Sequence, residues 1–312
     1  MRVLVTGSQG FVGRHLINEL RRHDWTIGAF DLAPANGQSA GIDYQQGDIQ
    51  DQKAVERVVK HFLPEACIHL SGLAFVPEGW INTEALVSVN LIGTIHLLEA
   101  CRQHAHSAKV LVISSAEVYG RQAGEHPLDE TCPFYPDNPY AVSKAAADRI
   151  ALLYARQHAM HTMVARPGNH IGPGQSSNFA VSSFAAQLGA IAAKKCPAVI
   201  KVGNLESRRD FTDVRDVARA YRLLIEKGRA GEAYNIASSH ETSLRIILDR
   251  LCEITGIKPK IEVAPERYRQ PEKRPQLDTA KIAREAGWNP EITLETTLQD
   301  IMAELTKKKN IA

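Results

Sequence analysis

Residues 2–20 read RVLVTGSQGFVGRHLINEL, and this stretch decides the fold. A short strand ends at Thr6, a glycine-rich turn follows, and the remainder has the spacing of apolar residues that is typical of an amphipathic helix. Gly7, Gly10 and Gly13 allow a tight turn and a close approach of the backbone to a ligand, and the N-terminus of the next helix attracts a pyrophosphate. The stretch therefore predicts an α/β fold with a Rossmann-type, doubly wound parallel sheet.

A second strand, predicted over 26–30, is followed by an acidic residue, Asp31. Its distance from the glycine turn is close to the ~20 residues at which such folds place the carboxylate that binds the ribose of a dinucleotide. A carboxylate repels a 2′-phosphate, so Asp31 favours NAD(H) as the cofactor and leaves NADP(H) as the alternative. The competing interpretation is that Asp31 is a turn residue in front of Pro34.

The apolar run over 110–113 predicts a buried parallel strand, and Ser115 follows its end, where open α/β sheets have their active-site crevice. A helix is predicted to open at Pro139, with Tyr140 and Lys144 four residues apart on one face. Because a nearby ammonium favours the phenolate, we expect the pKa of Tyr140 to be lowered towards the range of an acid–base catalyst. The alternative is an ordinary surface pair, although no other tyrosine is followed by lysine at this spacing.

Composition limits the classes of function. The chain has 312 residues, 44% of them hydrophobic and 23% charged, which is ordinary for a globular protein of one large or two moderate domains. Its net charge of +2 favours neither nucleic acid nor a membrane surface as a partner. The five cysteines are dispersed without metal-ligand spacing, so we expect no metal site and a cytoplasmic location with reduced thiols. We also expect no signal peptide and no membrane span, since no apolar run approaches ~20 residues.

The Gly-x-x-Gly-x-x-Gly spacing after Thr6, together with Tyr140 and Lys144, resembles the extended branch of the short-chain dehydrogenase/reductase superfamily. The resemblance implies that Lys144 holds the nicotinamide ribose and that Asp48 and Ile49 hold the adenine, although Asp48 is also suited to cap the following helix. The cofactor-binding residues that it implies are Gly7, Gln9, Gly10, Phe11, Val12, Gly13, Asp31, Leu32, Asp48, Ile49, Leu70, Ser71, Gly72, Tyr140 and Lys144.

The resemblance also implies a division of the chain. Residues 1–165 are expected to form the NAD(P)-binding Rossmann domain, with a returning segment around 209–237, and residues 166–312 mainly a smaller α/β domain that binds the nucleotide sugar. Single long helices are expected over 83–104 and 139–158, and relatives of this kind pair such helices into a four-helix bundle, so a homodimer is implied. Helices over about 243–255 and 279–286 are expected to close the chain.

Two runs in the C-terminal half, NHIGPGQS over 169–176 and VGNLESRRDFTDVRD over 202–216, resemble the GDP-6-deoxy-D-mannose reductases. The second run contains Arg208 and Arg209, and a guanidinium is well suited to bind the oxygens of a diphosphate. The alternative interpretation is that these two arginines form a surface salt-bridge cluster with Asp210. The chain departs from the reductase pattern at Pro271, which is shifted by one position, and at Gly168, which replaces an aromatic residue and leaves space beside the sugar. The implied substrate-binding residues are Ser115, Glu117, Asn169, Val202, Asn204, Arg209, Arg269 and Glu272.

Three reactions are compatible with this pattern. Reduction needs a proton donor, Tyr140, beside Ser115 and Lys144, whereas a 4,6-dehydratase also needs a base and an acid at the positions of Glu117 and Ala116, and a methyl group donates no proton. The resemblance thus implies NAD(P)H-dependent reduction of the 4-keto group of GDP-4-dehydro-6-deoxy-D-mannose to GDP-D-rhamnose, with Glu117 as a further candidate catalytic residue. The alternatives are a GDP-mannose 4,6-dehydratase, a 4-epimerase and a non-catalytic NAD-binding regulator.

Overall fold

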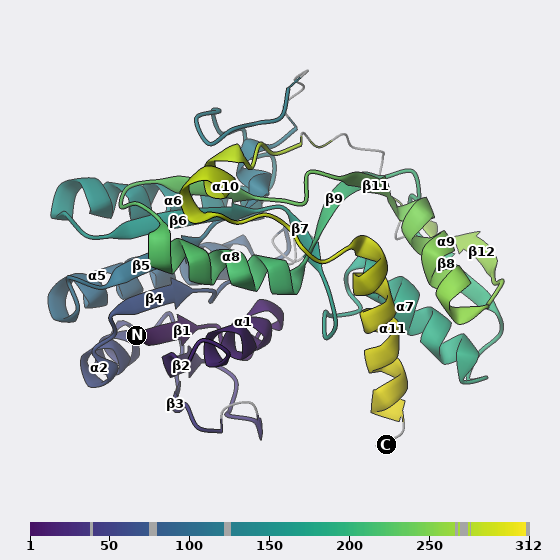
Figure 1. Cartoon of the computed structure of the whole chain (residues 1–312), viewed down its shortest axis with the longest axis horizontal. Coiled ribbons are helices and arrows are strands. Elements are labelled where there is room, and N and C mark those ends of the chain that lie inside the picture. Colours follow the sequence, from purple (N-terminus) through teal and green to yellow (C-terminus); the bar gives the residue numbers. More distant parts are fainter. Residues whose placement is uncertain are drawn as a thin grey trace.

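A seven-stranded parallel sheet forms the larger part of the molecule (Figure 1). The structure is a computed structural model, and it describes residues 1–37, 40–74, 80–121, 126–265, 268, 274 and 276–309. The sheet has the order β10-β6-β5-β4-β1-β2-β3. Its strands are β1 (Arg2–Thr6), β2 (Thr26–Asp31), β3 (Asp43–Gln46), β4 (Ala66–His69), β5 (Lys109–Ile113), β6 (Thr162–Pro167) and β10 (Ala233–Ile236). All neighbouring strands run parallel, which confirms the predicted Rossmann-type fold.

Helices cover both faces of this sheet, so the strands are buried on both sides. Alternate residues of β1 show this directly, because Val3 and Val5 lie in one hydrophobic cluster and Leu4 lies in the other. The first cluster is closed by α1 (Phe11–Arg21), α8 (Val214–Lys227) and α10 (Ala280–Ala286). The second is closed by α2 (Gln52–Phe62), α5 (Gly93–His104) and α6 (Pro139–His158).

The smaller part of the molecule has its own core and lies to the right in Figure 1. Its strands form a sheet of β11 (Glu241–Ser243), β9 (Arg208–Asp213) and β7 (Asn169–Ile171), and a pair of β12 (Lys260–Val263) with β8 (Val199–Val202). Its helices are α7 (Ala180–Ala192), α9 (Leu244–Thr255) and α11 (Leu294–Lys309). The expectation that a helix over 279–286 is the last one was wrong, because α11 follows it and buries Leu298 and Ile301 in this core.

The segment from Thr83 to His104 is not one uninterrupted helix. It consists of α4 (Thr83–Val87), a π-helical turn η2 (Ser88–Ile92) and α5. By length and composition alone this segment is apolar enough to cross a membrane, with a mean hydropathy of 1.3 and 44% of its apolar window buried inside the protein, a test that buried core helices also pass. It contacts α2 and α6, so it serves as a core helix of this fold.

Candidate active site

The glycine turn fits the close approach of a phosphate group. Gly7 has a φ of +71°, and a Cβ there would lie 2.7 Å from the amide nitrogen of Ser71. A Cβ at Gly13 would lie 2.4 Å from the carbonyl oxygen of Gly7. Among the described residues, no side chain caps the N-terminus of α1 at Gly10, and its first turn contains no acidic residue. The positive end of the helix dipole is therefore available to an anion.

Ser8 is a residue that sequence reasoning missed. Its side chain is 1% exposed, and its Oγ has no hydrogen-bond partner among the described residues. A buried hydroxyl without a partner is costly, and a bound diphosphate oxygen at this turn would satisfy it. The turn as folded thus fits the dinucleotide that the sequence predicts. Phe11 and Val12, which follow, are partly buried in the first turn of α1.

The side chain of Asp31, the last residue of β2, connects this strand to the glycine turn. Its carboxylate accepts hydrogen bonds from the backbone amides of Gln9 at 2.8 Å and Ala33 at 2.9 Å. Leu32, which lies between Asp31 and Ala33 in the chain, has an exposed side chain. This geometry places a carboxylate beside the turn, where the ribose was predicted, and it equally makes Asp31 a turn-stabilising residue.

Asp48 and Ile49 occupy the next crossover. Asp48 accepts a hydrogen bond from the amide of Gln50 at 2.9 Å, whereas the cap of α2 is Asp51, which accepts from the amides of two residues in the first turn. The alternative that Asp48 caps this helix is therefore wrong. The side chain of Ile49 is buried and meets the backbone of α5 at Gly93.

A chain of buried polar groups connects the ends of the strands. His69 bonds Thr6 Oγ1 at 2.7 Å and Thr94 Oγ1 at 3.0 Å, and burial, with the Lys144 charge as a smaller cause, lowers its pKa to about 3. His69 is therefore neutral at physiological pH. Leu70, Ser71 and Gly72 follow it directly at the carboxyl end of β4.

Asn90 lies in the π-helical turn η2 and forms several side-chain hydrogen bonds. The side chain of Asn90 donates to the carbonyl of Leu73 at 3.1 Å and to Ser143 Oγ at 3.0 Å, and it accepts from the amide of Leu73. A Cβ at Gly72 would lie 2.9 Å from its Oδ1 and 3.2 Å from Lys144 Nζ. Asn90 thus joins the segment after β4 to the first turns of α6.

The structure brings Ser115, Tyr140 and Lys144 together. Ser115 ends the segment after β5, and its hydroxyl accepts from the amide of Glu117 to cap a short 3₁₀ helix, η3 (Ala116–Tyr119). Tyr140 lies in the first turn of α6 and hydrogen-bonds with Ser115. Lys144, one turn further, donates from its buried Nζ to the carbonyl of Ile113 at 2.8 Å.

The pKa of Tyr140 differs from the sequence prediction. Burial raises it to about 12, a hydrogen bond with Ser115 opposes this, and the negative charge of Glu117 adds to it. Burial also lowers the pKa of Lys144 to about 8. The predicted lowering for Tyr140 was wrong for this structure, because losing hydration disfavours the phenolate and the Lys144 ammonium is bonded to a backbone carbonyl.

A buried ion pair between Arg166 and Asp148 is hydrogen-bonded to the last residue of η3, Tyr119. Arg166 donates from Nε and Nη2 to Asp148 at 2.8 and 3.0 Å, and their side chains are 1% and 0% exposed. Arg166 Nη1 also donates to the hydroxyl of Tyr119, which in turn donates to Asn235 Oδ1 at 2.8 Å. This network connects α6, β6, η3 and β10.

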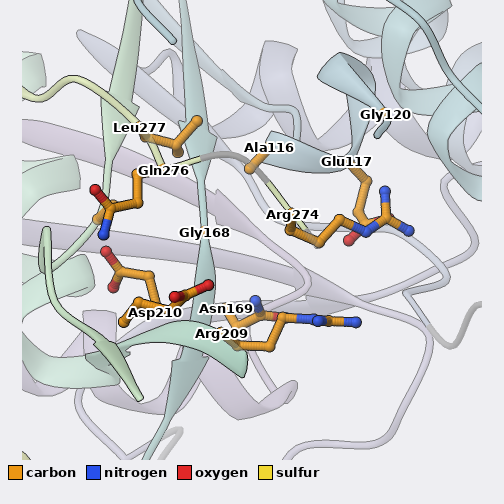
Figure 2. A pocket seen from close by; sticks show the side chains of 12 residues that line it. Ala116, Glu117, Gly120, Gly168, Asn169, Arg209, Asp210, Arg274, Gln276 and Leu277 are labelled. Carbon is orange, nitrogen blue, oxygen red and sulfur yellow. The ribbon is translucent and has the colours of Figure 1, made fainter. Parts of the chain in front are cut away.

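A pocket that opens to solvent is lined by Ala116 and Glu117, the two residues that follow Ser115 in the chain (Figure 2). It brings together three predicted substrate residues, Glu117, Asn169 and Arg209, and Gly168 adds no side chain to its wall. A Cβ at Gly168 would meet its nearest neighbour at 3.6 Å, which is ordinary contact, so there is room there as the sequence predicted. The full lining is Ala116, Glu117, Gly120, Gly168, Asn169, Arg209, Asp210, Ala237, Glu241, Arg274, Gln276 and Leu277.

Arg274 is the pocket residue that sequence reasoning most clearly missed. Its Nη2 lies 3.1 Å from Glu117 Oε2, and its Nη1 lies 3.6 Å from Asp137 Oδ2. Figure 2 shows the guanidinium and the carboxylate side by side. No short motif marks this contact, because the two residues are 157 positions apart in the chain.

Other predicted substrate residues lie away from this pocket or beyond what is described. Val202 is completely buried in the core of the smaller part, which leaves no side-chain surface for a ligand. Asn204 Oδ1 accepts from the amide of Glu206 in a turn. Arg208 pairs with Glu241 at 2.9 Å, so the predicted alternative, in which it clusters with Asp210, gives the wrong partner for it. Arg269 and Glu272 lie outside the described residues.

A Rossmann sheet, a glycine turn and a Ser/Tyr/Lys trio at the strand ends define an oxidoreductase class, the extended short-chain dehydrogenases/reductases. The family model described as GDP-mannose 4,6 dehydratase matches residues 4–301, and the chain belongs to this family.

Individual relatives point to more than one reaction. The chain is 34% identical to GDP-6-deoxy-D-mannose reductase of Pseudomonas aeruginosa over 97% of this chain and 96% of that protein. The structure of RMD from Pseudomonas aeruginosa complexed with NADPH matches with a TM-score of 0.88 and 33% identity, covering 98% of this chain and 99% of that one. UDP-glucose 4-epimerase of Thermus thermophilus, in complex with NAD, matches with a TM-score of 0.87 and 27% identity over 98% and 99% of the chains.

Proposed function

We propose that this protein reduces the 4-keto group of GDP-4-dehydro-6-deoxy-D-mannose to GDP-D-rhamnose with NAD(P)H. The observation that carries this is the intact proton-donating trio beside a pocket in which the dehydratase acid is absent, since Ala116 stands at its position and Glu117 is held by Arg274. The similarity to GDP-6-deoxy-D-mannose reductase supports the same reaction.

The proposed mechanism uses the trio as a proton-transfer unit. When bound, the reduced nicotinamide supplies the hydride. Tyr140 donates a proton to the oxygen at sugar carbon 4, since a phenol with a pKa of about 12 is protonated at neutral pH. The Ser115 hydroxyl, already bonded to the phenol, orients that oxygen. The Lys144 ammonium stabilises the phenolate that remains, and it is charged below its pKa of about 8.

The cofactor fits the groups at the glycine turn. Gly7, Ser8 and the N-terminus of α1 would hold the diphosphate, and Asp31 would accept from a ribose hydroxyl. Asp31 favours NADH, and the complex of RMD with NADPH supports use of the phosphorylated form as well. The residues from 166 onwards would supply most of the sugar-nucleotide pocket, with Asn169 and Arg209 binding the diphosphate.

We also propose that the protein is cytoplasmic and forms a homodimer. A cytoplasmic location is supported by five free cysteines, two of which, Cys67 and Cys101, have Sγ atoms 3.6 Å apart that are hydrogen-bonded and not joined by a disulfide. A homodimer that pairs the segment of η2 and α5 with α6 across a two-fold axis is supported by two exposed apolar side chains, Ile92 of η2 and Val142 of α6.

A dehydratase of GDP-mannose is the second candidate, because the matching family carries that name and Glu117 is present. One incubation separates the two. The protein is mixed with GDP-4-dehydro-6-deoxy-mannose and NADH or NADPH, with GDP-mannose and NAD⁺ in parallel. Loss of one reduced cofactor per keto sugar, with GDP-mannose untouched, supports the reductase. Conversion of GDP-mannose without net change of the cofactor would overturn the proposal in favour of the dehydratase.

A further inference from the structure

Glu117 is held at one oxygen by donors from two segments of the chain. Its Oε2 lies 3.1 Å from Arg274 Nη2, and Asn138 Nδ2 donates to the same oxygen at 3.5 Å. Both partners are partly buried, with 23% of the Glu117 side chain and 17% of the Arg274 side chain exposed. An ion pair that is this shielded is weakened less by water and salt than a surface pair.

Glu117 is also close to the reacting end of the site. Its side chain lines the pocket together with Gly168 and Asn169, and its charge contributes to the pKa of Tyr140. A carboxylate at this place is within the electrostatic reach of any carbonyl that accepts the proton of Tyr140. The structure therefore holds a potential base beside a site for a ketone.

A base at this position can remove a proton from the proposed substrate. The hydrogen on carbon 5 of a 4-keto sugar is acidic, because it is next to the carbonyl. If Glu117 removes it, the C5–H bond breaks, the proton moves to the carboxylate, and the electron pair forms a C4–C5 double bond. The carbonyl oxygen then takes up the proton of Tyr140. Reversal with a solvent-derived proton exchanges the hydrogen or inverts carbon 5, and no oxidant or reductant is consumed.

We propose that Arg274 determines which reaction this site performs, by keeping Glu117 from acting as a base at carbon 5. The charge-assisted pair with Arg274 and the hydrogen bond from Asn138 occupy one oxygen of Glu117 and fix its direction. An oxygen that is held in this way is not free to approach the hydrogen on carbon 5. Arg274 is thus a positioning residue that acts through Glu117, and the inference rests on the proposed reductase function.

The test follows hydrogen exchange at carbon 5 instead of turnover. GDP-4-dehydro-6-deoxy-mannose is incubated in D₂O with protein and without reductant, and deuterium at carbon 5 is measured by mass spectrometry and NMR. Arg274→Gln should exchange at least ~10-fold faster than the wild type, as expected when a general base is released. Arg274→Lys, which keeps the charge, should remain close to the wild type. The double variant Arg274→Gln/Glu117→Gln should return to the rate without protein.

A matched control is available at Asp137. Arg121 pairs with this carboxylate at 2.7 Å through an exposed guanidinium, so Arg121→Gln removes a neighbouring arginine from the same cluster. It should leave exchange unchanged. If Arg274→Gln folds, as judged by its thermal unfolding, but raises only KM without faster exchange, Arg274 is a substrate-binding residue and the inference is overturned. Wild-type reduction of the keto sugar with NAD(P)H is measured in parallel, and its absence would instead overturn the proposed function.

Discussion

At the scale of single residues, the site combines a phenol that is hard to ionise with an ammonium that is easy to deprotonate. Burial raises the pKa of Tyr140 to about 12 and lowers that of Lys144 to about 8. Both shifts disfavour the charged form, as expected when groups are withdrawn from water. The combination suits the direction of reduction, in which a neutral phenol gives up its proton to a substrate.

Tyr140→Phe tests the proton donor. The change removes only the hydroxyl, so the fold should be kept, and turnover should fall by the ~10²–10⁴-fold typical of a lost acid–base group. The measurement is steady-state reduction of the keto sugar, with circular dichroism as the check on folding. Turnover equal to that of the wild type would show that another group donates the proton.

Lys144→Met separates stability from activity. The folded pKa of about 8 lies below the ordinary 10.5, so burial of the ammonium costs stability at pH 7, and this cost disappears as pH rises from 8 to 10.5. The variant should unfold at higher urea, with a gain on the order of 1–3 kcal/mol at pH 7 that vanishes near pH 10.5, while reduction is lost. A variant that is less stable than the wild type at pH 7 would contradict this.

At the scale of elements, the network of Arg166 and Asp148 connects β6 and α6 to the 3₁₀ helix that carries Glu117. Arg166→Met leaves a buried carboxylate unpaired and should lower the free energy of unfolding by ~3–5 kcal/mol. The double change Arg166→Met/Asp148→Leu should cost much less than the sum of the single changes, since neither charge is then left alone. Urea unfolding measures all three, and additive losses would show that the pair is not coupled.

The elements also show what the sequence could predict. Strands β1, β2 and β5, the glycine turn and the start of α6 follow from local patterns, because apolar runs, Gly7 and the Asn138-Pro139 cap act within a few residues. The interruption at η2 is not readable in this way, since the apolar spacing of 83–104 suits a continuous helix and the turn is held by Asn90 contacts from elsewhere.

In the candidate site, too, local features were predictable and contacts between distant residues were not. Ser115, Tyr140 and Lys144 were predicted because a strand end and an i,i+4 pair are local features. The pairing of Glu117 with Arg274 and the direction of the Tyr140 pKa were not predictable, since both depend on burial and on contacts between distant parts of the chain. Val202 was assigned to the pocket by resemblance alone, and packing places it in a core.

At the scale of the whole molecule, the exposed apolar surface of η2 and α6 bears on assembly. Ile92 is 40% exposed and Val142 is 50% exposed, so both side chains are accessible to a partner. If these elements pair in a homodimer, Ile92→Glu/Val142→Glu should halve the mass in solution from twice 34.4 kDa to one chain. Light scattering after gel filtration measures this. Val263→Glu, on β12 and 60% exposed, is the control and should leave the mass unchanged.

The central claim is that a hydride ends on the sugar. The most direct measurement uses NADH or NADPH that carries deuterium at the transferred position, with GDP-4-dehydro-6-deoxy-mannose as substrate and mass spectrometry of the product. The account predicts one deuterium at carbon 4 for each cofactor oxidised, and its loss in Tyr140→Phe. A product formed without deuterium at carbon 4, or GDP-mannose converted while the cofactor returns to its starting state, would contradict it.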